Sequence, residues 1–121
     1  MDGCDYYSRQ GFDPAFWGPG AWTLLHVAAA NYPCQPTQRD KLRFARLVQA
    51  LAESLPCMSC RAHFAELLRG PLALSPEVLG NRFTAFEWTV RVHNAVNARL
   101  GKQVFDDADA WFRMYSAFRA S

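Results

Sequence analysis

Two cysteines, Cys57 and Cys60, are the residues best placed by type and spacing to carry chemistry, and they directly follow Pro56. On a helix, side chains three residues apart lie on nearly the same face, which brings two thiols within disulfide range. The positive end of a helix favours the thiolate, which is the reactive form in disulfide exchange. The same spacing also occurs in zinc sites and in thiol reductases of the thioredoxin type. The motif alone therefore leaves three functions open: metal binding, thiol reduction and thiol oxidation.

A zinc site would need further ligands beside the two cysteines. His63 shares their helical face, and a fourth ligand could come from Cys34, His26 or His93. However, the sequence has no second Cys-x-x-Cys and no His-x-x-x-His of the kind that structural zinc modules use. A chain of 121 residues, half of them hydrophobic, can also bury a core without a metal ion. We therefore predict no metal site.

Polar and aromatic residues at helical spacing form two further groups. Trp22 and His26 lie four residues apart in one segment, while His93, Asn94 and Asn97 lie within the stretch HNAVN of another. Buried His and Asn side chains need hydrogen-bond partners, and aromatic stripes most often belong to a core. Either group taken alone fits the packing of helices as well as it fits a binding site.

The elements that position these residues are predicted to be helices throughout, because proline, glycine and asparagine divide the chain into segments of helical periodicity without alternating strands. The first three expected helices run from after Pro19 to Pro33, from a cap at Thr37 to Pro56, and from Cys57 to Gly70. The fourth runs from a cap at Ser75 to Gly101, with an interruption at Gly80–Asn81. The short fifth covers residues 106–120. The predicted fold class is all-α, a four-helix bundle plus a short fifth helix. A thioredoxin fold needs a strand before its Cys-x-x-Cys, so that class is disfavoured.

Length and charge indicate one domain over residues 1–121, with residues 1–14 expected to be a flexible N-terminal segment. The net charge of +2 is spread over scattered Lys and Arg residues, which gives no reason to expect nucleic acid as a partner. No apolar run reaches the roughly 18 residues of a membrane span, and the N-terminal residues do not resemble a signal peptide. We therefore expect a cytoplasmic protein.

The motifs taken together resemble the Erv/ALR family of FAD-dependent sulfhydryl oxidases, and most of all the short oxidases of large DNA viruses. The matching residues, in chain order, are Trp17-Gly18, Trp22, Leu25-His26, Tyr32-Pro33, PCMSC at 56–60 and HNAVNARLGK at 93–102. Cellular members usually carry arginine where this chain has Pro19. They also have a structural disulfide whose two positions correspond here to Val90 and about Asp107.

The resemblance implies that FAD binds within the bundle, with its flavin ring against the Cys-x-x-Cys. Cys57 and Cys60 would then be the catalytic residues, Cys60 lying next to the flavin and Cys57 facing outward to receive electrons from a substrate thiol. The implied cofactor-binding residues are Gly18, Trp22, His26, Tyr32, Cys60, His63, His93, Asn94, Val96, Asn97, Leu100 and Lys102. Trp111 matches the family's C-terminal tryptophan only loosely, and no cofactor contact is predicted for it.

The implied reaction oxidises substrate thiols to a disulfide and passes the electrons to O2, which yields hydrogen peroxide. The implied substrate is a dithiol protein or a small redox shuttle protein. The resemblance also implies a homodimer with a second copy of the chain. By the viral resemblance, the products would be disulfides of virion proteins, formed in the host cytoplasm at assembly sites or in the virion. The alternative is a non-enzymatic helical binding module with a zinc or structural cysteine pair. Cys4 could act as an electron shuttle or cross-link two subunits, and both Cys4 and Cys34 also fit incidental free thiols.

Overall fold

The computed structural model describes residues 11–120, and within them the chain forms five α-helices, one 3₁₀ turn and no strand. The all-α prediction is therefore confirmed for the described residues. The elements are α2 (Pro14–Ala30), α3 (Gln38–Ser54), α4 (Met58–Arg69), η1 (Val78–Gly80), α5 (Arg82–Arg99) and α6 (Ala108–Ser116). None of these helices is long and apolar enough to cross a membrane.

Capping residues fix where two of the long helices begin. Thr37 and Asp40 form a reciprocal capping box at α3, in which Thr37 Oγ1 accepts from the Asp40 N–H at 3.1 Å and Asp40 Oδ2 accepts from the Thr37 N–H at 2.8 Å. The Asn81 side chain accepts from the Phe83 and Thr84 N–H groups and starts α5. The predicted cap at Thr37 and the predicted interruption at Gly80–Asn81 are both confirmed.

The first helix begins earlier than predicted. Asp13 caps it, with Oδ1 accepting from the Ala15 N–H at 2.9 Å, and Pro14 occupies the first helical position. Pro19 therefore lies inside α2 rather than before it. Proline is favoured in the first turn of a helix, so the prediction placed the start just after Pro19 and overlooked the Asp-Pro start signal at 13–14.

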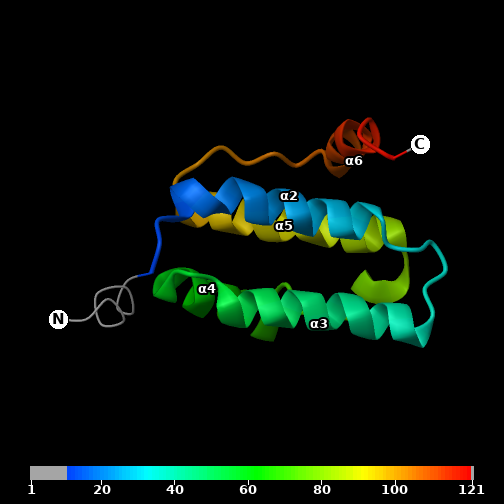
Figure 1. Ribbon diagram of the computed structural model, residues 1–121, viewed down its shortest axis with the longest axis horizontal. Coiled ribbons are helices and arrows are strands. Elements are labelled where there is room, and N and C mark those ends of the chain that lie inside the picture. The colour runs from blue at the N-terminus through cyan, green and yellow to red at the C-terminus, as the bar shows by residue number, and fades with distance from the viewer. Residues whose placement is uncertain (1–10, 121) are drawn as a thin grey trace.

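The helices pack as two rows with α6 laid on the outside (Figure 1). In Figure 1, α2 and α5 lie along one another, while α4 and α3 follow each other on the opposite side, and contacts join α2 to α5, α3 to α4 and α6 to both α2 and α5. Large side chains from both rows form the core, including Leu25, Phe44, Phe64 and Trp88. The Trp88 indole donates to the Leu72 carbonyl at 2.7 Å, so its one polar atom is satisfied inside this core.

A short segment ahead of α2 is tied to the cysteine motif. Gly11 pairs antiparallel with Cys57, and the Phe12 N–H donates to the Pro56 carbonyl at 2.6 Å. The Trp17 indole donates to the Phe12 carbonyl at 2.8 Å. Of the segment that we expected to be flexible, residues 1–10, including Cys4, lie outside the described residues, while residues 11–14 hold these defined contacts.

Gly11 is expected to be required for the pairing with Cys57. Its φ is +77°, which favours glycine, and a Cβ atom there would overlap the Pro56 carbonyl oxygen. Gly11→Ala should therefore detach residues 11–13 from the motif while the helices stay folded. After reduction, Cys57 should then react faster with iodoacetamide, which labelling followed by peptide mass spectrometry measures. Gly80→Ala is the control, because a Cβ at Gly80 meets nothing within 4 Å. Equal labelling rates in the two variants would contradict the pairing.

Candidate active site

Cys57 and Cys60 form a disulfide at the start of α4, with their Cα atoms 5.2 Å apart. Cys57 is the N-cap residue, so its sulfur faces the backbone N–H of Cys60 at 3.3 Å and lies 3.4 Å from the Ser59 hydroxyl. These groups and the positive helix end favour negative charge on sulfur, as disulfide exchange requires. Within residues 11–120 no three His, Cys, Asp or Glu side chains gather into a possible metal site. A disulfide at a helix N-terminus is an arrangement that permits thiol–disulfide exchange.

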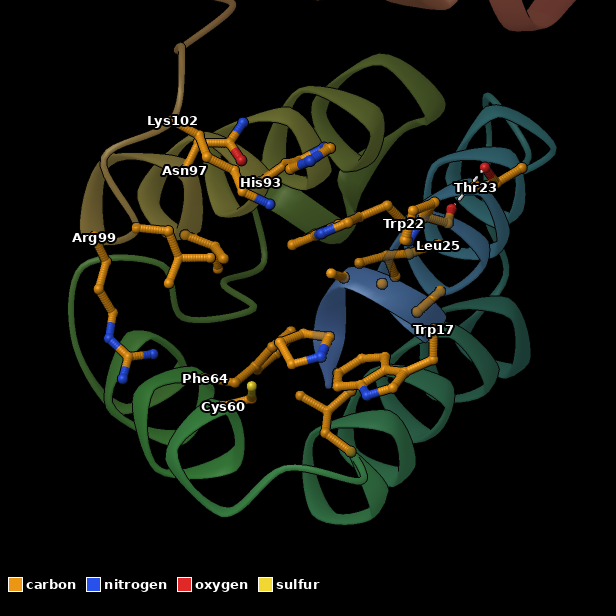
Figure 2. A pocket seen from close by; sticks show the side chains of 18 of the residues that line it. Trp17, Trp22, Thr23, Leu25, Cys60, Phe64, His93, Asn97, Arg99 and Lys102 are labelled. Atoms are coloured by element: carbon orange, nitrogen blue, oxygen red, sulfur yellow. Dashed lines mark hydrogen bonds between the residues drawn. The ribbon is translucent and has the colours of Figure 1, made fainter. Parts of the chain in front are cut away.

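The disulfide forms part of the wall of a cavity of about 690 Å³. This volume falls in the range of cofactor and small-molecule sites. Side chains from α2, α3, α4, α5 and α6 all reach it, so it lies between the two rows of helices (Figure 2). Most of the predicted site residues line it: Gly18, Trp22, Cys57, Cys60, His63, His93, Val96, Asn97, Leu100 and Lys102.

Aromatic rings dominate the cavity wall. Trp22 stacks on His93 with ring centroids 4.0 Å apart and planes 8° apart, and Trp111 meets His93 edge-on at 5.2 Å. Figure 2 shows Trp17 near Cys60 and Phe64, at the opposite end of the cavity from His93. Flat apolar walls at both ends suit a ligand with two planar ring systems.

Two cations and no acidic side chain appear among the described residues that line the cavity. Arg99 and Lys102 come from the end of α5 and the chain behind it, and Figure 2 places both along one side, with Asn97 beside Lys102. Guanidinium and ammonium groups bind phosphate oxygens strongly where no carboxylate competes for them. The cavity therefore suits an anionic ligand along this side.

The two histidines are hydrogen-bonded to one another. His26 Nε2 lies 2.9 Å from His93 Nδ1, and His26 Nδ1 lies 2.8 Å from Thr89 Oγ1. Burial, with a smaller effect from His93, lowers the pKa of His26 from 6.5 to about 3. Burial, with a smaller effect from Lys102, lowers the pKa of His93 to about 4. Both rings are therefore neutral at neutral pH.

Three predicted cofactor-binding residues do not line the cavity. His26 is fully buried directly behind Trp22 and His93, so it supports the wall rather than forming it. The Tyr32 hydroxyl donates to the Leu79 carbonyl at 2.7 Å, which holds the end of α2 against η1. Asn94 bonds the backbone of Phe105 through both its amide groups and so fixes the chain behind α5. The structure thus gives these three residues supporting roles.

Cys57 also differs from its prediction, because it does not face outward. Its exposed fraction is 8%, whereas Cys60 is half-buried in the cavity wall. The pairing of Gly11 with Cys57 covers this side of the motif, a long-range contact that the Cys-x-x-Cys spacing does not encode. Cys34 is an exposed free thiol remote from this motif in sequence.

Several lining residues were missed from the sequence. They are Trp17, Phe64, Arg99, Trp111 and Tyr115. Phe64 follows Cys60 by one turn of α4 and Arg99 follows Val96 by three residues on α5, so helical spacing from the predicted residues indicates both. Trp111 and Tyr115 belong to α6, whose packing against α2 and α5 no local pattern reveals.

Comparison with known proteins matches residues 19–116 to the model of the Erv1/Alr family. The chain belongs to the Erv1/Alr family. Among relatives, it is 37% identical over 97 residues to a probable FAD-linked sulfhydryl oxidase of Acanthamoeba polyphaga mimivirus, which covers 80% of this chain and 67% of the relative. An FAD-linked sulfhydryl oxidase of African swine fever virus is 37% identical over 90 residues, covering 73% and 71% of the two chains.

Cellular members of the Erv1/Alr family also match this chain. The FAD-linked sulfhydryl oxidase of Arabidopsis thaliana is 40% identical over 88 residues, which are 73% of this chain but 44% of the plant protein. The chain thus spans less than half of that relative. The crystal structure of the yeast Erv1 core superposes with a TM-score of 0.77 at 29% identity, covering 99% of this chain and 98% of that one. The FAD-binding domain of Erv1 from Saccharomyces cerevisiae superposes with a TM-score of 0.79 at 29% identity, covering 90% and 99%.

The neutral histidine pair should make this Erv1/Alr protein less stable as the pH falls. A histidine whose pKa is lowered by folding takes up a proton in the unfolded chain first, so acid favours unfolding. With folded pKa values of about 3 and about 4 against 6.5, stability is flat at neutral pH and falls below about pH 6.5. Each histidine should contribute about 2 kcal/mol between pH 7 and pH 5, the partly exposed His93 somewhat less, so we expect the free energy of unfolding, measured in urea, to drop by about 3–4 kcal/mol.

The matched control for this titration is His63→Gln. His63 lines the cavity but makes no hydrogen bond to the other two histidines, so its replacement should leave most of the drop in place. A wild-type urea midpoint that is the same at pH 5 and pH 7 would show that His26 and His93 titrate as exposed histidines do.

Proposed function

We propose that this protein is an FAD-dependent sulfhydryl oxidase that forms disulfides in protein thiols. The observation that carries the proposal is the Cys57–Cys60 disulfide in the wall of an aromatic, positively charged cavity. Membership of the Erv1/Alr family supports it, since relatives from viruses, plants and yeast are described as FAD-linked sulfhydryl oxidases. In this proposal the four longer helices form a bundle, and FAD binds between them.

The chemistry of the cavity fits FAD group by group. FAD has two planar ring systems joined by a pyrophosphate, and the cavity has aromatic walls at both ends with two cations along one side. Trp17, Phe64 and the disulfide would hold the flavin end, while Trp22 and His93 would hold the adenine end. Arg99 and Lys102 would bind the phosphates between them. Lining residues without charge, Val96 and Leu100 among them, would exclude water.

The protein's own part of the reaction is thiol–disulfide exchange. A substrate thiolate attacks Cys57, which forms a mixed disulfide and breaks the Cys57–Cys60 bond, leaving Cys60 as a thiolate. The second substrate thiolate attacks the substrate sulfur of the mixed disulfide, which releases the product disulfide and leaves both cysteines reduced. The Cys60 N–H and the Ser59 hydroxyl, which face the Cys57 sulfur, stabilise Cys57 as the leaving thiolate.

Bound FAD supplies the two-electron oxidant that restores the cysteine disulfide and passes the electrons to O2, so that two thiols and O2 give a disulfide and hydrogen peroxide. Because Cys57 is buried beneath the segment that begins at Gly11, a substrate reaches it only when that segment moves aside. The substrate is therefore a dithiol protein or a small redox shuttle protein that competes with this segment. The viral relatives support virion proteins made in the host cytoplasm as the final products.

The function is tested by oxygen consumption with dithiothreitol as the thiol. The wild-type protein should consume O2 and produce hydrogen peroxide, and Cys60→Ser should lower both to background while flavin absorbance is retained. Cys34→Ser is the control, because Cys34 is an exposed free thiol and its loss should leave the rate within about twofold. Oxygen uptake that survives in Cys60→Ser, or a protein that binds no flavin, would contradict the proposal.

We also propose that the protein is a homodimer that pairs through α2. Phe16, Leu24 and Val27 share one face of this helix and are 84%, 55% and 44% exposed. Large apolar side chains gathered on one face mark an interaction site, and a two-fold dimer buries the same face of both copies.

Leu24→Glu should shift the protein from dimer to monomer, because it would bury two carboxylates in the paired interface. Sedimentation velocity at micromolar concentration measures the change. Leu42→Glu, at a 44% exposed position on α3, should leave the dimer intact. A monomeric wild type, or a Leu24→Glu protein that sediments as a dimer, would rule out pairing through this face.

A further inference from the structure

A continuous chain of hydrogen bonds runs from α5 into α2 and back to the cavity. Thr89 Oγ1 lies 2.6 Å from the Phe86 carbonyl and 2.8 Å from His26 Nδ1, and His26 Nε2 lies 2.9 Å from His93 Nδ1. Thr89 and His26 each have an exposed fraction of 0%. Among residues 11–120, the Thr89 hydroxyl and the two ring nitrogens of His26 have no other side-chain hydrogen bonds, so the direction of each bond constrains the next.

The hydroxyl of Thr89 sets the direction at the buried end. Two oxygen atoms 2.6 Å apart need a proton between them, and the Phe86 carbonyl has none to give. Thr89 therefore donates to Phe86, which leaves its oxygen as an acceptor toward His26. It follows that His26 carries its proton on Nδ1.

The tautomer of His26 determines the tautomer of His93. A neutral imidazole has one N–H and one bare nitrogen, and both rings are neutral at pH 7 because folding lowers their pKa values. With the His26 proton on Nδ1, its Nε2 accepts a hydrogen bond, so His93 Nδ1 must donate it. The remaining nitrogen of His93, Nε2, is then left without a proton.

This bare nitrogen is open to the cavity. His93 lines the cavity, and no hydrogen bond within the described residues uses its Nε2. No enclosed side-chain nitrogen or oxygen among residues 11–120 lacks a partner, so Nε2 is not sealed in protein. Figure 2 shows His93 on the same side of the cavity as Asn97 and Lys102. The cavity wall thus carries one bare acceptor close to a cation.

We propose that Thr89 is a positioning residue that holds the His26–His93 pair in one tautomer, so that His93 presents a hydrogen-bond acceptor to the cofactor. This inference rests on the proposed function for the identity of the ligand, but not for the tautomer. The acceptor suits an amino or hydroxyl group of FAD and repels phosphate and carbonyl oxygens. Arg99 and Lys102 therefore bind the phosphates, while His93 keeps them away from its own end of the cavity.

The tautomers can be observed directly, since the chain has three histidines. Imidazole nitrogen shifts of the oxidised protein as purified, labelled with ¹⁵N, distinguish protonated from bare nitrogens at pH 7, and His63→Gln identifies the third ring. The wild type should show His26 and His93 both protonated at Nδ1. Signals with His93 protonated at Nε2 would overturn the proposal, whatever the enzyme's activity.

Two substitutions separate this role from simple packing. Thr89→Val keeps the shape but removes the acceptor, so His26 should move its proton to Nε2 and force the proton of His93 to Nε2 as well. Thr89→Ser loses a methyl group but keeps the hydroxyl, and it should retain the wild-type tautomers. The dissociation constant of FAD should rise roughly five- to tenfold in Thr89→Val and much less in Thr89→Ser.

Which of the two variants binds FAD more weakly decides whether Thr89 acts through the tautomers or only through packing. If Thr89 matters only for packing, the serine variant should be the weaker binder, and the valine variant should keep the wild-type nitrogen shifts. Should the valine variant fail to fold, the wild-type spectrum alone still confirms or overturns the tautomer assignment. A protein without oxidase activity but with both rings protonated at Nδ1 would contradict the proposed function and leave this inference standing.

Discussion

The hydrogen bonds that join His26 on α2 to Thr89 and His93 on α5 lie inside a helix contact that is otherwise apolar. A buried polar group without a partner costs about 1–3 kcal/mol, so α2 and α5 are held in the one register that satisfies all three side chains. That register also brings Trp22 onto His93 as a stacked pair and lets α6 place Trp111 against both histidines. One end of the cavity therefore depends on this buried polar contact.

The other end depends on the start of α4. Cys57 caps the helix and forms a disulfide with Cys60, three residues further along. The backbone of Gly11 and Phe12 lies against Pro56 and Cys57. The helix N-terminus favours negative charge on sulfur, and in the proposed function the segment at Gly11 and Phe12 would limit which thiols reach Cys57. Between the two ends lie two cations, Arg99 in the last turn of α5 and Lys102 behind it. In the proposed function they would bind the pyrophosphate, and the cavity would join the cysteine pair to the cofactor.

Local signals in the sequence predicted those features that depend on a few neighbouring residues. The cap at Thr37 and the interruption at Gly80–Asn81 were predictable because the hydrogen-bond partners of Thr37 and Asn81 lie two or three residues away. The disulfide was predictable because the two cysteines are only three residues apart, at the start of one helix. The predicted start of α2 was wrong because Pro19 was taken to mark the first turn of the helix, whereas Asp13 and Pro14 mark it.

Features that depend on distant residues could not be predicted in this way. Tyr32 was predicted to bind the cofactor, yet its hydroxyl donates a hydrogen bond to the carbonyl of Leu79, 47 residues away in the sequence. Asn94 likewise bonds Phe105, 11 residues further along the chain, and the cover over Cys57 comes from Gly11. The family resemblance supplied the cavity's chemistry, but the division between residues that line it and residues that support it required the packed structure.

In the proposed function, the Cys57–Cys60 pair exchanges electrons with FAD held in the adjoining cavity. Anaerobic titration of the purified protein with dithiothreitol, followed by its visible absorbance spectrum, tests this most directly. The flavin absorbance should bleach as the thiol is added and should return when air is admitted. A flavin spectrum that does not respond to the thiol, or a colourless protein, would contradict it.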